Sequence, residues 1–180
     1  MYLIIFDEIT DDYEKIQKLE KKASTDTLTK LFNRSKFDDV LNKEMELSST
    51  ANSPFSIIFL DIDHFKLVND NFGHDVGDEV LIELANILTS TTRTGDFISR
   101  WGGEEFMITL QAANVKQAQK LAEKLRKAVQ EYKFKSAGKQ TISLGVTQYI
   151  NHEKKDTFIK RVDEALYEAK ETGRNKVVAK

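Results

Sequence analysis

Residues Arg100 to Phe106 read RWGGEEF, and this stretch decides how the rest of the chain is interpreted. Strand-like apolar residues stand on both sides of it, Phe97-Ile98 before and Phe106-Met107-Ile108 after. Two adjacent glycines between such segments predict a tight hairpin, because glycine tolerates positive φ and lets a ligand approach the backbone closely. Glu104 and Glu105 follow the turn directly, and alternation along a strand predicts different roles for them. Taken alone, the stretch is equally compatible with an ordinary acidic surface turn.

A second acidic group upstream favours the functional interpretation. Residues Phe55 to Leu60 read FSIIFL, the continuous apolar run of a strand covered on both faces, and they lead into Asp61-Ile62-Asp63. Acidic groups at the end of a buried strand commonly gather around a cation. Asp61 alone would be explained as a polar strand end, but with Glu104 and Glu105 it predicts a site for one or two divalent ions. Oxygen-only ligands indicate Mg²⁺ or Mn²⁺ and not Zn²⁺.

The composition limits the class of protein. The chain has 180 residues, 40% of them hydrophobic and 31% charged, which suits one soluble domain of ordinary size plus an appendage. A net charge of -2 argues against a protein that coats nucleic acid. The absence of cysteine excludes disulfides and thiolate metal sites and fits a cytoplasmic location. No apolar run approaches the roughly 20 residues that a membrane span needs. We therefore expect a compact mixed α/β domain.

Apolar spacing predicts the other elements. Helical faces are indicated after the segment STDTLTKLFNR (24–34), after the segment 69–78, over Val115 to Tyr132 and over Phe158 to Glu171. A strand is expected over Thr141 to Ile150, and a short last strand at Val177-Val178. The glycine-punctuated segment 69–78 itself is interpreted as a polar turn. Its Asn and Asp side chains have the donors and acceptors to read a purine edge, although helix capping would also explain them.

The N-terminal residues suggest a connection to another domain. Residues 1–9 form a strand-like run that begins abruptly, which predicts the end of an upstream sensor domain. Apolar residues then recur at three- and four-residue spacing at Tyr13, Ile16, Leu19 and Ala23. We expect residues 1–23 to comprise that domain end and a linker helix that pairs two subunits. A helix packed on its own domain is the alternative.

Five ordered blocks resemble the GGDEF diguanylate cyclase domain over about residues 24–180. They are DTLTKLFNR (26–34), DIDHFKLVND (61–70), FGHDVGDEVL (72–81), GGEEF (102–106) and YEAKETGRN (167–175). The resemblance implies an α/β (α+β) palm-type fold like that of nucleotidyl cyclases. This is a central, mostly antiparallel five-stranded sheet flanked by helices. It also implies condensation of two GTP into cyclic di-GMP and two pyrophosphates.

The same resemblance assigns roles to individual residues. Mg²⁺ or Mn²⁺ would be bound by Asp61, Glu104 and the backbone carbonyl of Ile62, with Glu105 as a further ligand or as an aid to deprotonating the attacking 3′-hydroxyl. The substrate-binding residues it implies are Phe65, Asn69 and Asp78 at the guanine side, Lys66, Lys170 and Arg174 at the β- and γ-phosphates, and Gly102 and Gly103 beside the α-phosphate and ribose. Family members with mixed purine products tend to carry Ser at the position of Asp78, so Asp78 favours guanine.

Two further positions matter in this comparison. Arg93 and Asp96 form an RxxD motif five residues before the glycine pair, where many members bind product as an inhibitor. An arginine fork suits phosphates and guanine edges, although a plain surface ion pair is the alternative. Lys30 stands where the family usually has glycine, and we expect this to alter a loop and not the chemistry.

The resemblance also implies a homodimer, because each subunit would hold only one GTP and bond formation needs two sites facing each other. The rival interpretation is a catalytically idle domain that binds GTP or cyclic di-GMP as a receptor. Such relatives usually lose an acid of the signature, and this chain keeps Asp61, Glu104 and Glu105. An enzyme that makes a 3′,5′-cyclic mononucleotide is disfavoured by Asn69, Asp78 and the signature.

Overall fold

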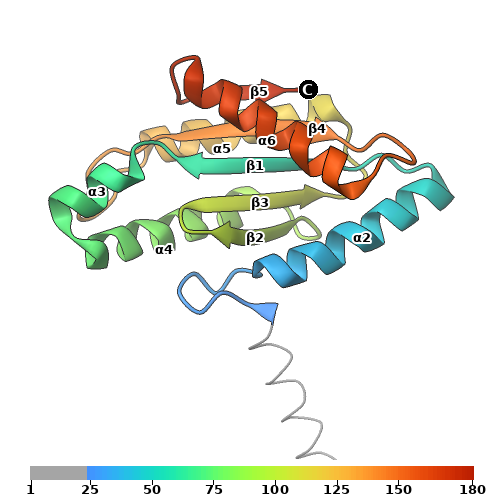
Figure 1. The fold of residues 1–180 in the computed structure, drawn as a ribbon. Helices are drawn as coiled ribbons and strands as arrows, with labels where there is room; N and C mark the ends of the chain where they lie inside the picture. The colour runs from blue at the N-terminus through green and yellow to red at the C-terminus, as the bar shows by residue number, and fades with distance from the viewer. Residues whose placement is uncertain (1–23) are drawn as a thin grey trace, which may run out of the picture.

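The computed structural model describes residues 24–180, which form a five-stranded sheet with helices on both faces (Figure 1). The strand order is β2-β3-β1-β4-β5. The strands are β1 (Ser56–Ile62), β2 (Phe97–Gly102), β3 (Glu105–Leu110), β4 (Ile142–Gln148) and β5 (Val177–Ala179). All neighbouring pairs are antiparallel except β4 and β5, which are parallel. The sheet is therefore mixed, and the expected mostly antiparallel five-stranded architecture is confirmed.

The described helices divide between the two faces of the sheet. They are α2 (Arg34–Ala51), α3 (Phe65–Phe72), α4 (His74–Thr91), α5 (Val115–Glu131) and α6 (Lys155–Glu171). Helices α2 and α6 cover one face, α4 and α5 cover the other, and α3 lies at the end of the sheet (Figure 1). The amphipathic spacing predicted for α5 and α6 is confirmed, since their apolar positions are buried.

The central strand explains why the sheet needs helices on both sides. Every residue of β1 is buried. Its side chains alternate, so that Ile57 and Phe59 pack in the α2/α6 core while Ile58 and Leu60 pack in the α4/α5 core. A strand buried on both faces is mainly apolar, as over Ile57 to Leu60, and the hydroxyl of Ser56 donates to the carbonyl of Ala113 at 2.8 Å.

Asp61 is the penultimate residue of β1, at the strand end where the sequence predicted it. One sequence-based expectation was wrong. The segment 69–78 is not one polar turn, because Asn69 belongs to α3 and Asp78 to α4. Gly73 alone separates these two helices and, at φ 86°, both ends the first and begins the second. Helix α2 is capped by Asn33, whose side chain accepts from the N–H of Lys36.

The expected upstream domain end and linker helix, residues 1–23, lie outside the described residues. Among residues 24–180, no helix combines the length and the apolar character that crossing a membrane requires.

Candidate active site

The acidic residues predicted to act together meet at one end of the sheet. The antiparallel pairing of β1 and β3 places Asp61 opposite Glu105, so their side chains share a face of the sheet. Glu104 lies in the turn before β3. Gly103 of this turn has φ 48°, in the left-handed region, which supports the predicted need for glycine. The guanidinium Nε of Arg100 donates to the carbonyl of Gly103 at 2.9 Å and holds the turn.

Partial burial raises the pKa values of Asp61, Glu104 and Glu105. Burial raises the pKa of Asp61, partly offset by Lys170. Burial also raises the pKa of Glu104 and of Glu105, and the negative charge of Asp61 raises both further. Three carboxyl groups with raised pKa values repel one another when ionised, so the arrangement favours a bound cation or a proton.

The donor chemistry fits a hard divalent cation, because all three side chains offer carboxylate oxygens. Among the described residues, however, no three acidic, histidine or cysteine side chains are close enough together to hold a metal ion as they stand. Instead, the ammonium Nζ of Lys170 lies 2.7 Å from Oδ2 of Asp61. Lys170 thus supplies the positive charge next to Asp61 in this structure.

Lys170 and Arg174 reach the acidic group from the C-terminal end of α6. The positive charge of Arg174 also lowers the pKa of Asp61, which places both cations near this carboxylate. Gly173, Arg174 and Asn175 all have positive φ, at 116°, 60° and 46°. Non-glycine residues rarely adopt this conformation, so the loop depends on neighbours that hold it in place.

Asp63 is one such neighbour, and sequence reasoning gave it no role. Its carboxylate is 4% exposed and accepts from the hydroxyls of Thr141 at 2.7 Å and Ser143 at 2.6 Å, and from the N–H of Asn175 at 3.0 Å. On the other side, Arg126 donates to Oδ1 of Asn175 at 2.8 Å. Asp63 therefore connects the end of β1 to the loop that carries Arg174. The repeated acid in the sequence DID was the available signal.

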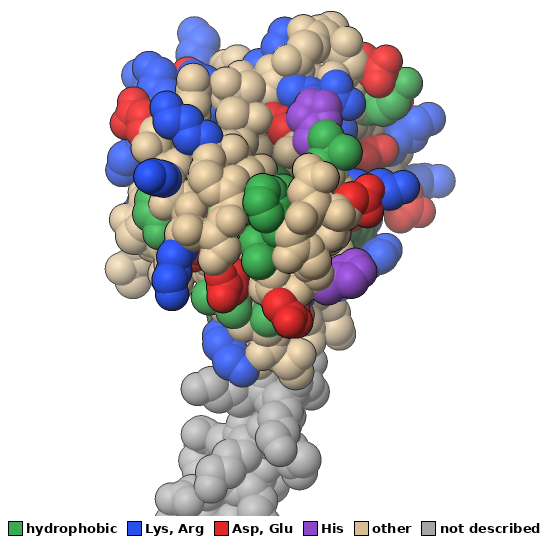
Figure 2. Space-filling model, turned by 90° about the vertical axis from the view of Figure 1, so that its left-hand side faces the viewer, with side chains coloured by type: hydrophobic (Ala, Val, Ile, Leu, Met, Phe, Trp, Pro, Cys, Tyr) green, Lys and Arg blue, Asp and Glu red, His purple; other side chains and the backbone are tan. Residues whose placement is uncertain are grey.

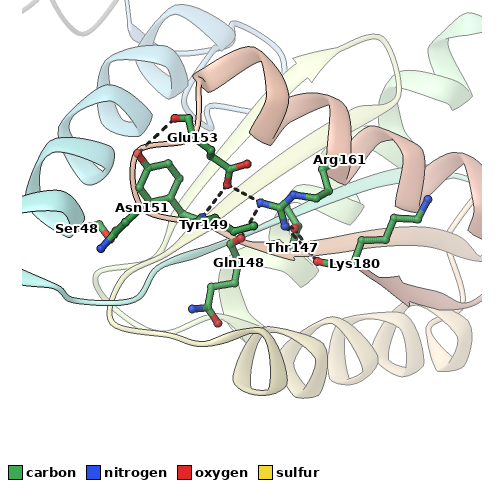
Figure 3. Close-up of polar contacts among 9 residues, drawn as sticks. Ser48, Thr147, Gln148, Tyr149, Asn151, Glu153, Arg161 and Lys180 are labelled. Atoms are coloured by element: carbon green, nitrogen blue, oxygen red, sulfur yellow. Dashed lines mark hydrogen bonds and ion pairs between the residues drawn. The ribbon is translucent and has the colours of Figure 1, made fainter.

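A polar network in the N-terminal half of α6 holds this helix against β4 (Figure 3). The guanidinium of Arg161 donates to the carbonyl of Gln148 at 2.9 Å and to Glu153 at 2.5 Å, and also contacts the hydroxyl of Thr147. Glu153 in turn accepts from the N–H of Ile150 at 2.7 Å. Arg161 therefore ties α6, the helix that carries Lys170 in its last turn, to β4.

The residues predicted to recognise guanine lie on α3 and α4, at the end of the molecule seen in Figure 2, where charged side chains of both signs surround small hydrophobic areas. Asn69 is half-buried on α3 and Asp78 is exposed on α4. Lys66 is exposed on the first turn of α3. Phe65 is only 5% exposed and packs in the α4/α5 core, so it offers little surface to a ligand.

The RxxD motif lies elsewhere. Arg93 and Asp96 precede β2, whereas the glycine turn follows it, so roughly 20 Å of strand separates the two sites in one chain. Nε of Arg93 lies 3.2 Å from Oδ1 of Asp96, and its Nη2 donates to the carbonyl of Gln111 at 2.5 Å. A pocket of about 220 Å³ adjoins the pair and is lined also by Leu110, Gln117 and Leu121. The predicted pair thus exists, beside a pocket.

Lys30 has φ 62° and its Nζ donates to the carbonyl of Thr27 at 2.6 Å. The turn thus requires the left-handed conformation that glycine adopts without strain, which accounts for the glycine that the resemblance implies at this position.

Known proteins resemble this chain in sequence and in structure. The sequence profile of the family "Diguanylate cyclase, GGDEF domain" matches residues 23–176. The chain is 38% identical over 179 residues to the diguanylate cyclase DgcM of Escherichia coli, covering 99% of this chain and 44% of DgcM. The chain therefore spans less than half the length of this relative.

Two solved structures are similar to this one. The coiled coil and GGDEF domain of DgcB from Caulobacter crescentus, in complex with c-di-GMP, matches with a TM-score of 0.91 at 29% identity, covering 97% of this chain and 95% of that one. The active GGEEF domain of a diguanylate cyclase from Vibrio cholerae matches with a TM-score of 0.78 at 37% identity, covering 82% of this chain and 96% of that one. The chain belongs to the GGDEF diguanylate cyclase domain family.

Proposed function

We propose that this domain condenses two GTP molecules into cyclic di-GMP and two pyrophosphates. The observation that carries the proposal is the pairing of Asp61 with Glu105 across β1 and β3, next to Glu104 and the cations Lys170 and Arg174. Carboxylates with raised pKa values beside two cations suit a site for a metal-bound triphosphate. Asp61, Glu104 and Glu105, the carboxylates to which the family resemblance assigns catalysis, are all present in this chain.

Each residue has a role in this reaction. Asp61, Glu104 and the carbonyl of Ile62 would hold Mg²⁺ or Mn²⁺, with Glu105 as a further ligand or proton acceptor. When bound, the ion would neutralise phosphate charge and favour ionisation of the attacking hydroxyl. Lys170 would exchange its partner Asp61 for the β- and γ-phosphates, which Lys66 and Arg174 would also bind. Gly102 and Gly103 would leave room for the α-phosphate and ribose.

Two active sites, one in each subunit, would each supply one GTP and form one of the two new bonds. Each 3′-hydroxyl oxygen attacks the α-phosphorus of the GTP held by the other subunit, forms a P–O bond and loses its proton. The bond from that phosphorus to the pyrophosphate group breaks. Two such steps close the ring and release two pyrophosphates, so a homodimer is required. Residues 1–23 would form the linker helix that brings the subunits together, downstream of a sensor domain.

Three further parts of the proposal concern selectivity, regulation and location. Asn69 and Asp78 would read the guanine edge, since an amide and a carboxylate together match its donors and acceptors. Arg93 and Asp96 would bind cyclic di-GMP and inhibit, supported by the adjoining pocket. The domain would work in the cytoplasm, where GTP is available.

The test compares the full chain with its Glu105→Gln variant in GTP and Mg²⁺, with products identified by mass spectrometry. The proposal predicts cyclic di-GMP with two pyrophosphates per molecule from the unmodified chain and none from the variant. Glu105→Gln keeps the shape and removes the charge, so circular dichroism should show an intact fold. Full activity of the variant would overturn the assignment of the acidic site. Tight GTP binding without product from the unmodified chain would favour a receptor domain.

A further inference from the structure

Gly77 is a glycine that the backbone does not require. It lies within α4, is buried, and is not among the residues with positive φ. Glycine is the least favourable residue in a helix interior apart from proline. Alanine would therefore be favoured here unless a neighbour excludes its methyl group.

The neighbour that excludes a methyl group is Asn69. A Cβ built on Gly77 would lie far inside contact distance of Oδ1 of Asn69, and 3.1 Å from its Cγ. The next nearest atom is Cζ of Phe65, at 3.2 Å. Both residues belong to α3, so the missing side chain is what lets the Asn69 carboxamide lie against α4.

This carboxamide is positioned but unused by the protein. Within residues 24–180 it makes no hydrogen bond to a side chain or to the backbone, and Asn69 is only half-buried. Asp78 follows Gly77 directly and is exposed, and its carboxylate likewise has no ion pair among the described residues. An unpaired amide thus lies against Gly77, and the next residue of α4 carries an unpaired carboxylate.

We propose that Gly77 is a specificity-determining position, whose missing side chain lets Asn69 and Asp78 together bind the edge of the base. The inference rests on the proposed function, which identifies that base as guanine. Gly77 touches no substrate atom in this account. It acts as a positioning residue through Asn69.

A second glycine shows how a purely structural role differs. A Cβ on Gly145 in β4 would collide with backbone atoms of Val162 and Leu166 in α6. Backbone packed against a strand cannot move aside, so Gly145→Ala should destabilise the fold. At Gly77 the colliding atom is the end of a flexible side chain, so the fold can accept a methyl group while the amide is displaced.

The experiment compares Gly77→Ala, Asn69→Ala and Gly145→Ala in the full chain. Calorimetry with Mg²⁺ measures the Kd of GTP and of inorganic tripolyphosphate, a probe that lacks the base. For Gly77→Ala we expect the Kd of GTP to rise about tenfold, because the displaced amide would lose one well-placed pair of hydrogen bonds to the base. The Kd of tripolyphosphate should not change, and Tm should stay within about 3 °C of the parent or rise. Gly145→Ala should lower Tm clearly.

A double variant makes the test specific. In the Asn69→Ala background the colliding oxygen is absent, so Gly77→Ala should add no further loss of GTP affinity. An unchanged Kd of GTP in Gly77→Ala would overturn the inference if Asn69→Ala still weakens binding. An equal loss for GTP and tripolyphosphate with a large fall in Tm would also overturn it, as a general structural effect. If Asn69→Ala itself leaves GTP affinity unchanged, both this inference and the guanine assignment of the proposed function are wrong.

Discussion

Removal of the Asp63 carboxylate should loosen the loop that carries Arg174 while leaving Asp61, Glu104 and Glu105 in place. Asp63 is 4% exposed, and its three hydrogen-bond donors come from β4, from the residue before β4 and from Asn175. The Asn175 bond holds a segment in which Arg174 and Asn175 both have positive φ. In Asp63→Ala that segment should relax toward ordinary backbone conformations and carry Arg174 away from the site.

The magnitude follows from the contacts. Hydrogen bonds to a charged group contribute about 1.5–3 kcal/mol each, and three donors that share one carboxylate do not add fully. We expect Asp63→Ala to lower the free energy of unfolding by about 3–5 kcal/mol, within the range for a broken buried network. For a chain of 180 residues this corresponds to a fall in Tm of about 10 °C.

The assay is thermal unfolding together with calorimetric binding of tripolyphosphate in Mg²⁺. Asp61→Asn is the matched control, because it lies two positions earlier in the chain. Burial raises the pKa of Asp61, so removing its charge should leave Tm unchanged or higher while activity is lost. The Tm of Asp63→Asn should lie between those of Asp63→Ala and the parent, since an amide oxygen still accepts hydrogen bonds. A Tm within 2 °C of the parent for Asp63→Ala, or unchanged tripolyphosphate affinity, would refute this reasoning.

Three other predictions concern pH, feedback and backbone strain. The pKa values of Asp61, Glu104 and Glu105 are raised in the folded state, which therefore binds more protons than the unfolded state. The free energy of unfolding without metal should therefore fall as pH rises from the unfolded pKa values of 3.8 and 4.5 through the raised folded values. Glu105→Gln should weaken this fall in thermal unfolding without metal, and an identical pH profile would contradict the electrostatic picture. Arg93→Ala should relieve inhibition by cyclic di-GMP without raising the initial rate, and unchanged sensitivity in a rate assay would show that the RxxD site does not regulate this chain. Lys30→Gly should change the free energy of unfolding by less than about 1 kcal/mol in denaturant titration with activity intact, because relief of positive φ is offset by greater freedom of the unfolded chain. A loss of activity in that variant would show that the Lys30 turn affects the site.

Local patterns in the sequence predicted much of the fold. The uninterrupted apolar run of β1 and the glycine pair before β3 each have one simple structural explanation, and both predictions were confirmed. The segment 69–78 failed because polar side chains and Gly73 looked like a turn. Its apolar residues, Phe72 and Val76, are too few to reveal that the segment holds the end of α3 and the start of α4, which pack on each other and on the core.

The site was predicted less completely than the fold. Facing strands bring Asp61 and Glu105 together, as expected from their places in the strands. The ion pair between Asp61 and Lys170 was not foreseen, because it depends on where α6 ends relative to β1. The contacts of Asp63 and the packing of Asn69 against Gly77 were missed for the same reason. Each depends on a contact between segments distant in sequence or on separate helices, which spacing along the chain does not encode.

The measurement that tests the central claim most directly is the rate of cyclic di-GMP formation as a function of protein concentration. It should be made for the full chain and for a chain without residues 1–23, with the oligomeric state followed by analytical ultracentrifugation. Two half-sites predict a rate per subunit that rises with concentration as dimers form, and a shift of this rise to higher concentration when residues 1–23 are absent. A constant rate per subunit from a protein that stays monomeric would contradict the account.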